Sequence, residues 1–527
     1  MKRDEMLARI RERKEPWDII VIGGGATGAG IAVDAASRGL AALLLEREDF
    51  AKGTSSRSTK LVHGGVRYLE QGNISLVMEA LKERGILLRN APHLVHDVPF
   101  VVPNYSWWET PFYGIGMKIY DLLAGKYGFG KSRVLSREET LERLPTLRQD
   151  GLRGGVIYHD GQFDDSRLLI HLMQTAVDHG AVVLNYAPVV ELHKGEDGFL
   201  DGVVAVDSET AERFSLRAHA VVNATGIFTD EVRRMADKTA ATMIAPSQGI
   251  HLVLDASFLR GDTAIMVPHT SDGRVMFAIP WHRHTVIGTT DTPLEQASYE
   301  PLPLEEEIAF VLETASEYLS RPPKRDDVLS VYVGIRPLVK AAGSDASKTS
   351  ALSRDHTIHI DPSGLLTIVG GKWTTYRRMA EDAVNHAITL GRLADIPCVT
   401  ETLHIHGYRE NVDLLEDLWV YGSDVDQIQS LAGESPELAQ RLHPDLPYIA
   451  AEVVWAARME MARSVEDVLA RRTRALFLNA RAAMAMAPRV ASLLAVELGK
   501  DTAWADAEVK KFNQLAAQYT LDHSATL

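Results

Sequence analysis

Hydrophobic and polar positions near the start of the chain alternate in blocks. An apolar run at residues 18–22 precedes a glycine cluster at 23–25, a helix-compatible segment at 26–39 and a second apolar run at 41–45. Short apolar runs that alternate with a helical pattern are typical of βαβ units and a parallel sheet. The pattern therefore predicts strand, helix and strand in this order.

Later apolar runs fall into further groups. β-Branched runs recur between residues 181 and 226, and the run at 365–369 precedes another helix start. Runs between residues 251 and 291 are separated by polar turns, which is typical of hairpins in an antiparallel sheet. From about residue 400 the apolar residues follow a helical period, with Ser464 and Asp467 spaced as a capping box. We expect a separate helical C-terminal domain.

Composition narrows the class of protein. The chain has 527 residues, which indicates two or three domains, and its formal net charge of -15 argues against nucleic-acid binding. A single cysteine, Cys398, excludes an intrachain disulfide framework and makes a thiol-ligated metal cluster unexpected, so no metal is predicted. No secretory signal and no apolar window of about 18 residues is apparent. These features predict a cytoplasmic protein without a membrane-spanning helix.

The glycine cluster carries the first chemical signal. Gly23, Gly25 and Gly28 form GxGxxG between a predicted strand and a predicted helix, and Glu46 ends the second strand. Such a turn permits close approach of the backbone to a pyrophosphate, and the acid can bind a ribose hydroxyl. A nicotinamide enzyme would normally continue with βαβ units, whereas here the polar segment TSSRSTKLVHGG follows. This interruption favours FAD.

Six motifs in order resemble a known family. They are IGGGATGAGIAVDAASRGL, TSSRSTKLVHGGVRYLEQG, VVNATG, IGTTD, GIRPL and GGKWTTYR, within residues 17–385. With family-like spacing, they resemble the FAD-dependent, quinone-linked glycerol-3-phosphate dehydrogenases of the amino-acid-oxidase-like flavoprotein superfamily. The segment SVEDVLARRTR resembles the C-terminal domain of that family.

The resemblance implies an architecture. An α/β FAD-binding Rossmann-like domain is interleaved with an antiparallel-sheet substrate domain, and an all-α C-terminal domain follows. The expected bounds are an N-terminal extension at 1–16, FAD-binding segments at about 17–66, 150–226 and 330–400, substrate-domain segments at about 67–149 and 227–329, and the helical domain at 401–527.

The resemblance also implies the cofactor site. Hydroxyl residues and glycines allow backbone N–H groups to reach the pyrophosphate and the flavin ring, whose reduced form is anionic. The residues expected to bind FAD are Gly23, Gly25, Ala26, Thr27, Gly28, Glu46, Arg47, Thr54, Ser55, Ser56, Lys60, His63, Gly64, Gly65, Pro188, Val189, Ala224, Thr225, Gly226, Gly371, Lys372 and Thr374.

The expected substrate is glycerol 3-phosphate, which is oxidised to dihydroxyacetone phosphate. Arginine and lysine suit phosphate oxygens, and the resemblance places Arg67, Tyr68, Arg336, Lys372 and His251 at the substrate. A base must take the hydroxyl proton, and histidine suits this role. His63 is the first candidate and His251 the second, although each could instead orient the cofactor or pack. Arg336 and Lys372 could stabilise the developing alkoxide.

The family implies that electrons leave to a membrane quinone. Aromatic, apolar and basic residues within 104–133, including Trp107, Trp108, Phe112, Tyr113 and Met117, suit a peripheral membrane surface, although a packed or dimer surface is equally compatible. The charged N-terminal segment is predicted to be a solvent-exposed helix rather than a lipid contact. An oxidase producing hydrogen peroxide, another amino-acid-oxidase-like flavoenzyme and a non-catalytic dinucleotide sensor are the alternatives. A homodimer is compatible with the sequence.

Overall fold

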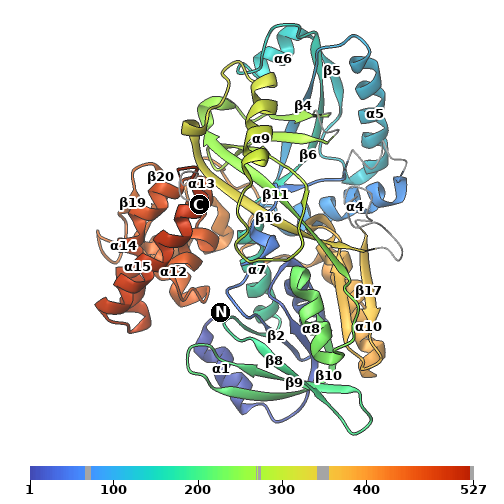
Figure 1. Ribbon diagram of the computed structural model, residues 1–527, viewed down its shortest axis with the longest axis vertical. Coiled ribbons are helices and arrows are strands. Elements are labelled where there is room, and N and C mark those ends of the chain that lie inside the picture. The colour runs from blue at the N-terminus through green and yellow to red at the C-terminus, as the bar shows by residue number, and fades with distance from the viewer. Residues whose placement is uncertain (66–72, 269, 271–273, 341–354, 523–527) are drawn as a thin grey trace.

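The computed structural model describes residues 1–65, 73–268, 270, 274–340 and 355–522. Figure 1 shows a lower part built on one sheet, an upper part built on a second sheet, and the C-terminal helices packed against one side of both. The chain passes between the two sheets several times, so each is assembled from segments far apart in sequence.

The first sheet has eight strands in the order β17-β18-β10-β1-β2-β7, with β9 beside β10 and β8 beside β9. The pairs that join β18, β10, β1, β2 and β7 are parallel. The strands are β1 (Trp17–Ile22), β2 (Ala42–Leu45), β7 (Val182–Leu184), β8 (Val189–Lys194), β9 (Leu200–Val206), β10 (Arg213–Asn223), β17 (His356–Ile360) and β18 (Leu366–Gly370). This confirms the predicted βαβ opening.

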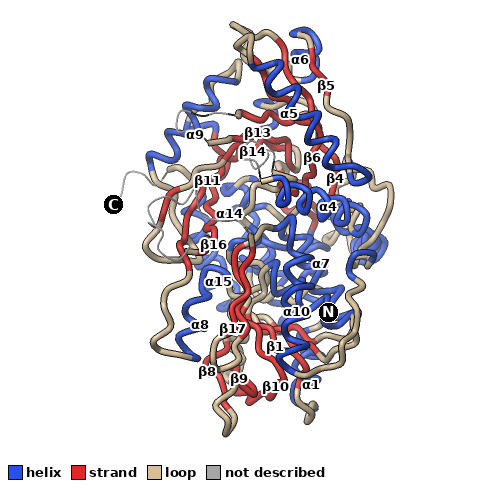
Figure 2. Tube along the Cα trace, turned by 90° about the vertical axis from the view of Figure 1, so that its right-hand side faces the viewer, coloured by secondary structure: helices blue, strands red, loops and turns tan. Residues whose placement is uncertain are grey.

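Helices cover this sheet, as expected for a parallel sheet whose strands are buried on both faces. The helix of the opening unit, α2, packs between α7 and α10. The helices of this part are α2 (Ala26–Ser37), α7 (Asp165–Asp178), α8 (Thr229–Ala236) and α10 (Tyr376–Gly391). Figure 2 shows α10 running alongside β1 and β17.

The second sheet has ten strands in the order β15-β11-β14-β13-β12-β4-β6-β3, with β16 beside β11 and β5 beside β6. All its pairs are antiparallel except β4 with β12. The strands are β3 (Leu61–Val62), β4 (Val95–Asn104), β5 (Arg133–Leu135), β6 (Gly154–Phe163), β11 (Ile244–Asp255), β12 (Ala264–Val267), β13 (Met276–Trp281), β14 (His284–Gly288), β15 (Thr292–Pro293) and β16 (Val328–Val339). Its helices are α4 (Ile74–Asn90), α5 (Glu109–Ala124), α6 (Arg137–Arg143) and α9 (Glu305–Tyr318).

The strand pairing differs from the expected boundaries at three places. The sequence assigned residues 17–66, 150–226 and 330–400 to the FAD-binding domain, yet β3, β6 and β16 pair within the second sheet. Strands of the two sheets have similar apolar content, and periodicity does not identify the partner of a strand. Only the pairing itself separates the two domains at these points.

The N-terminal extension forms a packed helix. One face of α1 (Arg3–Glu12) buries Met6, Leu7 and Ile10 in the core of the first domain, and Arg3 pairs with buried Asp207 at 2.6 Å. The terminal ammonium of Met1 donates to the carbonyl of Met459 in the C-terminal part at 3.0 Å. The expectation of a solvated helix therefore holds for only one of its faces.

The C-terminal part is helical apart from a two-stranded hairpin. Its elements are α11 (Val425–Ala432), β19 (Arg441–His443), β20 (Leu446–Ile449), α12 (Ala450–Met459), a π-helical segment (Asp467–Arg472), α13 (Ala475–Leu478), α14 (Ala480–Leu498) and α15 (Thr502–Ala516). The predicted capping box is confirmed, because Asp467 N–H donates to Ser464 Oγ at 3.1 Å while Ser464 N–H donates to Asp467 Oδ2 at 3.1 Å.

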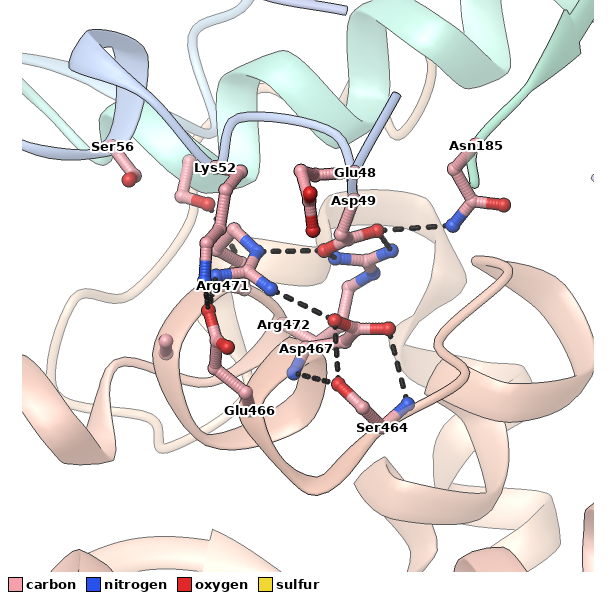
Figure 3. Close-up of polar contacts among 12 residues, drawn as sticks. Glu48, Asp49, Lys52, Ser56, Asn185, Ser464, Glu466, Asp467, Arg471 and Arg472 are labelled. Carbon is pink, nitrogen blue, oxygen red and sulfur yellow. Dashed lines mark hydrogen bonds and ion pairs between the residues drawn. The ribbon is translucent and has the colours of Figure 1, made fainter. Parts of the chain in front are cut away.

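Buried ion pairs join this helical part to the first domain. Figure 3 shows Asp49 bound by Arg471 and Arg472, with Nε–Oδ2 and Nη1–Oδ2 distances of 2.6 and 2.7 Å. Burial opposes the charge of Asp49, but Arg472 and Arg471 lower the pKa of its carboxyl group. The contact keeps Asp49 ionised inside the interface, a few residues after the second strand of the opening unit.

Candidate active site

One elongated cavity follows the carboxyl ends of the parallel strands. Its lining includes the residues directly after β1, β2, β10 and β18, and it extends to β11 and β16 of the second sheet. Ligands of open α/β sheets bind at this edge. The cavity has an empty volume of about 2040 Å³, including the part open to solvent, which leaves room for an extended dinucleotide beside a small substrate.

The glycine-rich turn fits a pyrophosphate. Gly23 has a φ of +113°, and a Cβ there would lie 2.6 Å from the carbonyl oxygen of Ala224. A Cβ on Gly28 would lie 1.9 Å from the carbonyl oxygen of Gly23, so the helix packs on the turn only because this residue is glycine. The first turn of α2 carries no acidic residue. Gly25, Ala26 and Thr27 line the cavity, so the N-terminus of α2 and its partial positive charge can meet an anion there.

Glu46 and Arg47 lie at the far end of this turn. Glu46 Oε2 accepts the N–H of Gly24 at 2.6 Å and Oε1 accepts the N–H of Glu48 at 2.8 Å. Burial raises the pKa of Glu46 despite these bonds. The Arg47 guanidinium lies 4.8 Å from the ring centre of Phe228 and 5.0 Å from that of Tyr299, and all three residues line the cavity.

The polar segment after the second strand lines the middle of the cavity. Ser55 Oγ accepts the N–H of Ala26 at 2.9 Å, and the Ser55 carbonyl accepts the indole N–H of Trp373 at 2.9 Å. Thr54 Oγ1 donates to the carbonyl of Ile335 at 2.6 Å. These bonds tie the segment to the glycine-rich turn on one side and to both later motifs on the other.

Arg336 and Lys372 enter the same cavity from β16 and from the turn after β18. Arg336 Nη2 donates to the carbonyl of Thr290 at 3.0 Å, and its Nη1 lies 3.3 Å from Asp291 Oδ1. Asp291 in turn accepts a hydrogen bond from Ser247 Oγ. The Arg336 side chain is 24% exposed and lines the cavity, so these bonds orient it without burying it fully.

Two histidines line the cavity, His63 and His251. His251 stacks on Tyr332 with ring centres 4.7 Å apart, and its Nε2 lies 2.9 Å from Thr59 Oγ1. Burial lowers the pKa of His251 well below its ordinary value, and Lys60 and Arg336 act in the same direction. His251 is therefore neutral near pH 7, and the same surroundings make it a weaker base than an ordinary histidine.

A family model described as FAD dependent oxidoreductase matches residues 18–377, and one described as the C-terminal domain of alpha-glycerophosphate oxidase matches residues 366–505. The mitochondrial glycerol-3-phosphate dehydrogenase of Homo sapiens is 42% identical over 533 residues, which cover 95% of this chain and 73% of that protein. The chain belongs to the FAD-dependent glycerol-3-phosphate dehydrogenase family.

Other comparisons agree with this assignment. The mitochondrial glycerol-3-phosphate dehydrogenase of Arabidopsis thaliana is 41% identical, covering 97% of this chain and 87% of that one. The solved structure of the glycerol-3-phosphate dehydrogenase from Bacillus halodurans in complex with FAD superposes with a TM-score of 0.79 at 31% identity, over 98% of this chain and 97% of that one. The protein is thus an FAD-dependent oxidoreductase.

Most residues that the sequence predicted for this dehydrogenase family member lie around one cavity. Its lining contains Gly23, Gly25, Ala26, Thr27, Glu46, Arg47, Thr54, Ser55, His63, Val189, Ala224, Thr225, Gly226, His251, Arg336, Gly371, Lys372 and Thr374. Arg67 and Tyr68 lie outside the described residues.

Six predicted cofactor residues of the dehydrogenase are not part of this lining: Gly28, Ser56, Lys60, Gly64, Gly65 and Pro188. The clearest correction is Lys60, whose Nζ is fully buried against Asp165 Oδ2 at 2.7 Å and the carbonyl of Ser56 at 2.8 Å. Gly64 N–H donates to Tyr120 at 2.8 Å, away from the cavity. A lysine within a polar segment looks like a ligand in sequence, whereas its partner lies over one hundred positions away.

The sequence reasoning missed several lining residues. Arg57 and Thr59 stand inside the quoted motif, but Arg57 Nη2 binds Glu300 Oε2 at 2.7 Å, so its charge serves the fold of the dehydrogenase. Thr59 could have been found as another hydroxyl of the same motif. Phe228 and Tyr299 also line the cavity, and no motif marked them.

Proposed function

We propose that the protein oxidises sn-glycerol 3-phosphate to dihydroxyacetone phosphate and passes the electrons to a membrane quinone. The observation that carries the proposal is that Arg336 and Lys372 line the same cavity as the glycine-rich turn. The pyrophosphate of a dinucleotide already has its anion site at that turn, so two further cations in the same cavity suit a second, small anion. The names of the relatives support glycerol 3-phosphate as that anion.

The cations of the cavity bind the substrate phosphate, and one of its histidines removes the hydroxyl proton. Arg336 offers a planar fork for phosphate oxygens, and Lys372 adds a second charge. FAD, when bound, accepts the hydride from C2. The hydroxyl proton must pass to a base, and the two cavity histidines, His63 and His251, are the candidates. Both cations also favour negative charge on the oxygen as this proton leaves.

The membrane part of the proposal depends on α5 and the turn before it. Exposed apolar side chains there are Trp107, Trp108, Phe112, Ile115, Ile119 and Leu122, with exposed fractions from 44% to 79%. Lys118, Lys126 and Lys131 are exposed close by. Such a surface suits the interface of an anionic bilayer. Figure 1 shows α5 on the opposite side of the molecule from the C-terminal helices.

Two of the residues predicted for this surface are buried instead. Tyr113 and Met117 point inward, 7% and 1% exposed, and pack with Tyr120 and Ala124 in the core of the second domain. Their spacing follows the helical period, which separates the inner face of α5 from the outer one. Within the described residues, no helix is both long enough and apolar enough to cross a bilayer.

The test of the electron acceptor starts from the purified holoenzyme reduced by glycerol 3-phosphate without oxygen. One portion is mixed with a short-chain quinone and another with oxygenated buffer, and the return of flavin absorbance is followed. We expect the quinone to restore the oxidised spectrum at least about tenfold faster. Faster return with oxygen, together with hydrogen peroxide, would assign the protein to the oxidases.

A further inference from the structure

The segment 56–60 separates the cavity from a buried group of charges. Arg57, Ser58 and Thr59 line the cavity, while Ser56 and Lys60 face the opposite side. Lys60 adopts a positive φ of 65°, which turns its side chain away from the direction of its neighbours. The charges behind the segment therefore set the position of the residues that face the cavity.

Asp165, the first residue of α7, is the centre of this group. Its Oδ2 accepts the N–H of Ser58 at 3.0 Å, the hydroxyl of Ser58 at 2.7 Å and Lys60 Nζ at 2.7 Å. Its Oδ1 accepts Arg474 Nη2 at 3.2 Å and the N–H of Ser166 at 2.8 Å. One carboxylate thus holds both the backbone and a side chain of Ser58.

Arg474 reaches this group from the C-terminal part. Its Nη2 also donates to the carbonyl of Ser56 at 2.7 Å, and Nη1 donates to the carbonyl of Ala470 at 2.8 Å. The guanidinium lies 4.3 Å from the ring centre of Phe477 and is 2% exposed. These contacts fix its plane, so the helical domain supplies a rigid clamp for the first residue of the segment.

The opposite side of the segment holds His251. Thr59 Oγ1 lies 2.9 Å from His251 Nε2, and the hydroxyl of Tyr332 donates to the carbonyl of Ser58 at 3.1 Å. The rings of Tyr332 and His251 stack with 12° between their planes. Thr59 and Ser58 therefore both hold the imidazole of His251 in place. Thr59 contacts Nε2 of the imidazole, and the carbonyl of Ser58 binds Tyr332, whose ring stacks on the imidazole.

Stability alone does not explain this group. Removing several charges from water costs about as much as their mutual attraction returns, so a buried ion pair is weak as a source of net stability. Burial lowers the pKa of Lys60 to about 7, although Asp165 acts to raise it. The benefit that the geometry offers is orientation, because Asp165 and Arg474 each bind a residue of the segment that carries Thr59.

We propose that Arg474 and Asp165 are positioning residues for His251, acting through Ser58 and Thr59, and that the C-terminal helical domain thereby takes part in the reaction. The proposal rests on the proposed function, since it concerns the orientation of a candidate base. It assigns to the helical domain a task in the active site in addition to packing.

The test compares Arg474→Gln with Arg472→Gln in the full-length holoenzyme. Arg472 is a matched control, since it is also buried in the helical part and also crosses to the first domain, but it binds Asp49 at 2.7 and 2.8 Å rather than the segment 56–60. Melting temperature reports general damage. The rate of anaerobic flavin reduction by saturating glycerol 3-phosphate shows whether His251 is correctly placed. The rate of hydrogen exchange at the amides of residues 56–62 shows whether the segment is still held.

We expect Arg474→Gln to slow flavin reduction about tenfold or more with KM little changed, and to speed exchange of the Ser58 amide. Arg472→Gln should lower the melting temperature at least as much, with reduction slowed less than about threefold. Equal slowing in the two variants, or unchanged reduction in Arg474→Gln, would overturn the proposal.

Thr59 gives a test that does not disturb the interface. Thr59→Val keeps the shape but removes the bond to His251, so we expect slower reduction and a shifted pH profile, with Thr59→Ser restoring both. Identical rates for Thr59→Val and wild type would refute the role of Thr59 even if Arg474→Gln does not fold. If the wild-type flavin ignores glycerol 3-phosphate, the proposed function fails, and the exchange rates still decide whether Arg474 holds the segment.

Discussion

Ser55 Oγ accepts a hydrogen bond of 2.9 Å from the N–H of Ala26. This bond joins the polar segment to the first turn of the helix that follows the glycine-rich turn, which has no other side-chain cap. It fixes the N-terminus of α2 at the wall of the cavity, where the N–H groups next to it can meet the cofactor phosphates.

Ser55→Ala should weaken FAD binding. Loss of a helix cap costs about 1 kcal/mol, which corresponds to a dissociation constant raised about fivefold. Fluorescence titration of the apoprotein with FAD measures this. Ser37→Ala is the control, because Ser37 Oγ donates to the carbonyl of Asp34 at the other end of the same helix. Equal weakening by both variants would contradict the role given to Ser55.

Arg336→Lys should impair recognition of the substrate phosphate while flavin content stays normal. Lysine keeps the charge but loses the planar fork and the bond to the carbonyl of Thr290. Hydrogen bonds to charged groups contribute about 1.5–3 kcal/mol, so KM should rise roughly 10- to 100-fold. Steady-state kinetics with a dye acceptor measures KM, and Arg321→Lys, an exposed residue paired with Asp327, is the control. Loss of bound flavin in Arg336→Lys would assign the arginine to the cofactor instead.

The raised pKa of His406 makes the stability of the protein depend on pH. Burial opposes the charge of this histidine, but the hydrogen bonds that its ring N–H groups donate to Asp178 at 2.6 Å and to Asp424 at 3.1 Å raise the pKa of His406 to about 9. A histidine with a raised folded pKa stabilises the protein fully below its unfolded value of about 6.5 and loses this effect as the pH rises through about 9. The effect is at most about 3 kcal/mol, because the side chain is partly exposed.

His406→Gln removes this dependence. The melting temperature of the variant should lie several degrees below that of wild type at pH 6, and the gap should close by about pH 9.5. Comparing the two proteins at each pH cancels the other titrating groups. A gap of constant size between these pH values would show that His406 is not charged through its two carboxylate partners.

The α5 surface predicts binding to anionic vesicles. Ile115→Asp combined with Leu122→Asp places charges on its outer face, where the two side chains are 63% and 79% exposed, and should abolish co-sedimentation with vesicles of phosphatidylglycerol and phosphatidylcholine. Turnover with a soluble dye should persist. Val496→Asp changes an equally exposed side chain, 79%, on α14 and should sediment like wild type. Unaltered sedimentation of the double variant would remove α5 from the membrane contact.

The sequence predicted best those features that depend on neighbouring residues. The strand, glycine turn and helix at residues 17–37 form a local pattern, because Gly28 packs against the carbonyl of Gly23 within the same turn. The contact of Gly23 with the backbone of Ala224 is not local and could not be predicted in this way. The capping box at Ser464 is local in the same way. Such patterns carry their own physical reason and need no knowledge of distant segments.

Features that depend on distant partners were harder to predict. Lys60 was predicted to bind FAD, but Asp165 binds it from a remote part of the chain. The position of Arg474 beneath the cavity likewise follows from the docking of the helical part, which no periodicity encodes. A charge in a polar motif reveals its role only when its partner is known.

Anaerobic mixing of the flavoprotein with sn-glycerol 3-phosphate, compared with unphosphorylated glycerol, decides whether the protein oxidises the phosphorylated alcohol. We expect glycerol 3-phosphate to bleach the flavin rapidly and stoichiometrically, and glycerol to fail even in large excess, because Arg336 and Lys372 need a phosphate to bind. A flavin that stays oxidised with glycerol 3-phosphate, or that is bleached equally well by glycerol, would contradict the proposed function.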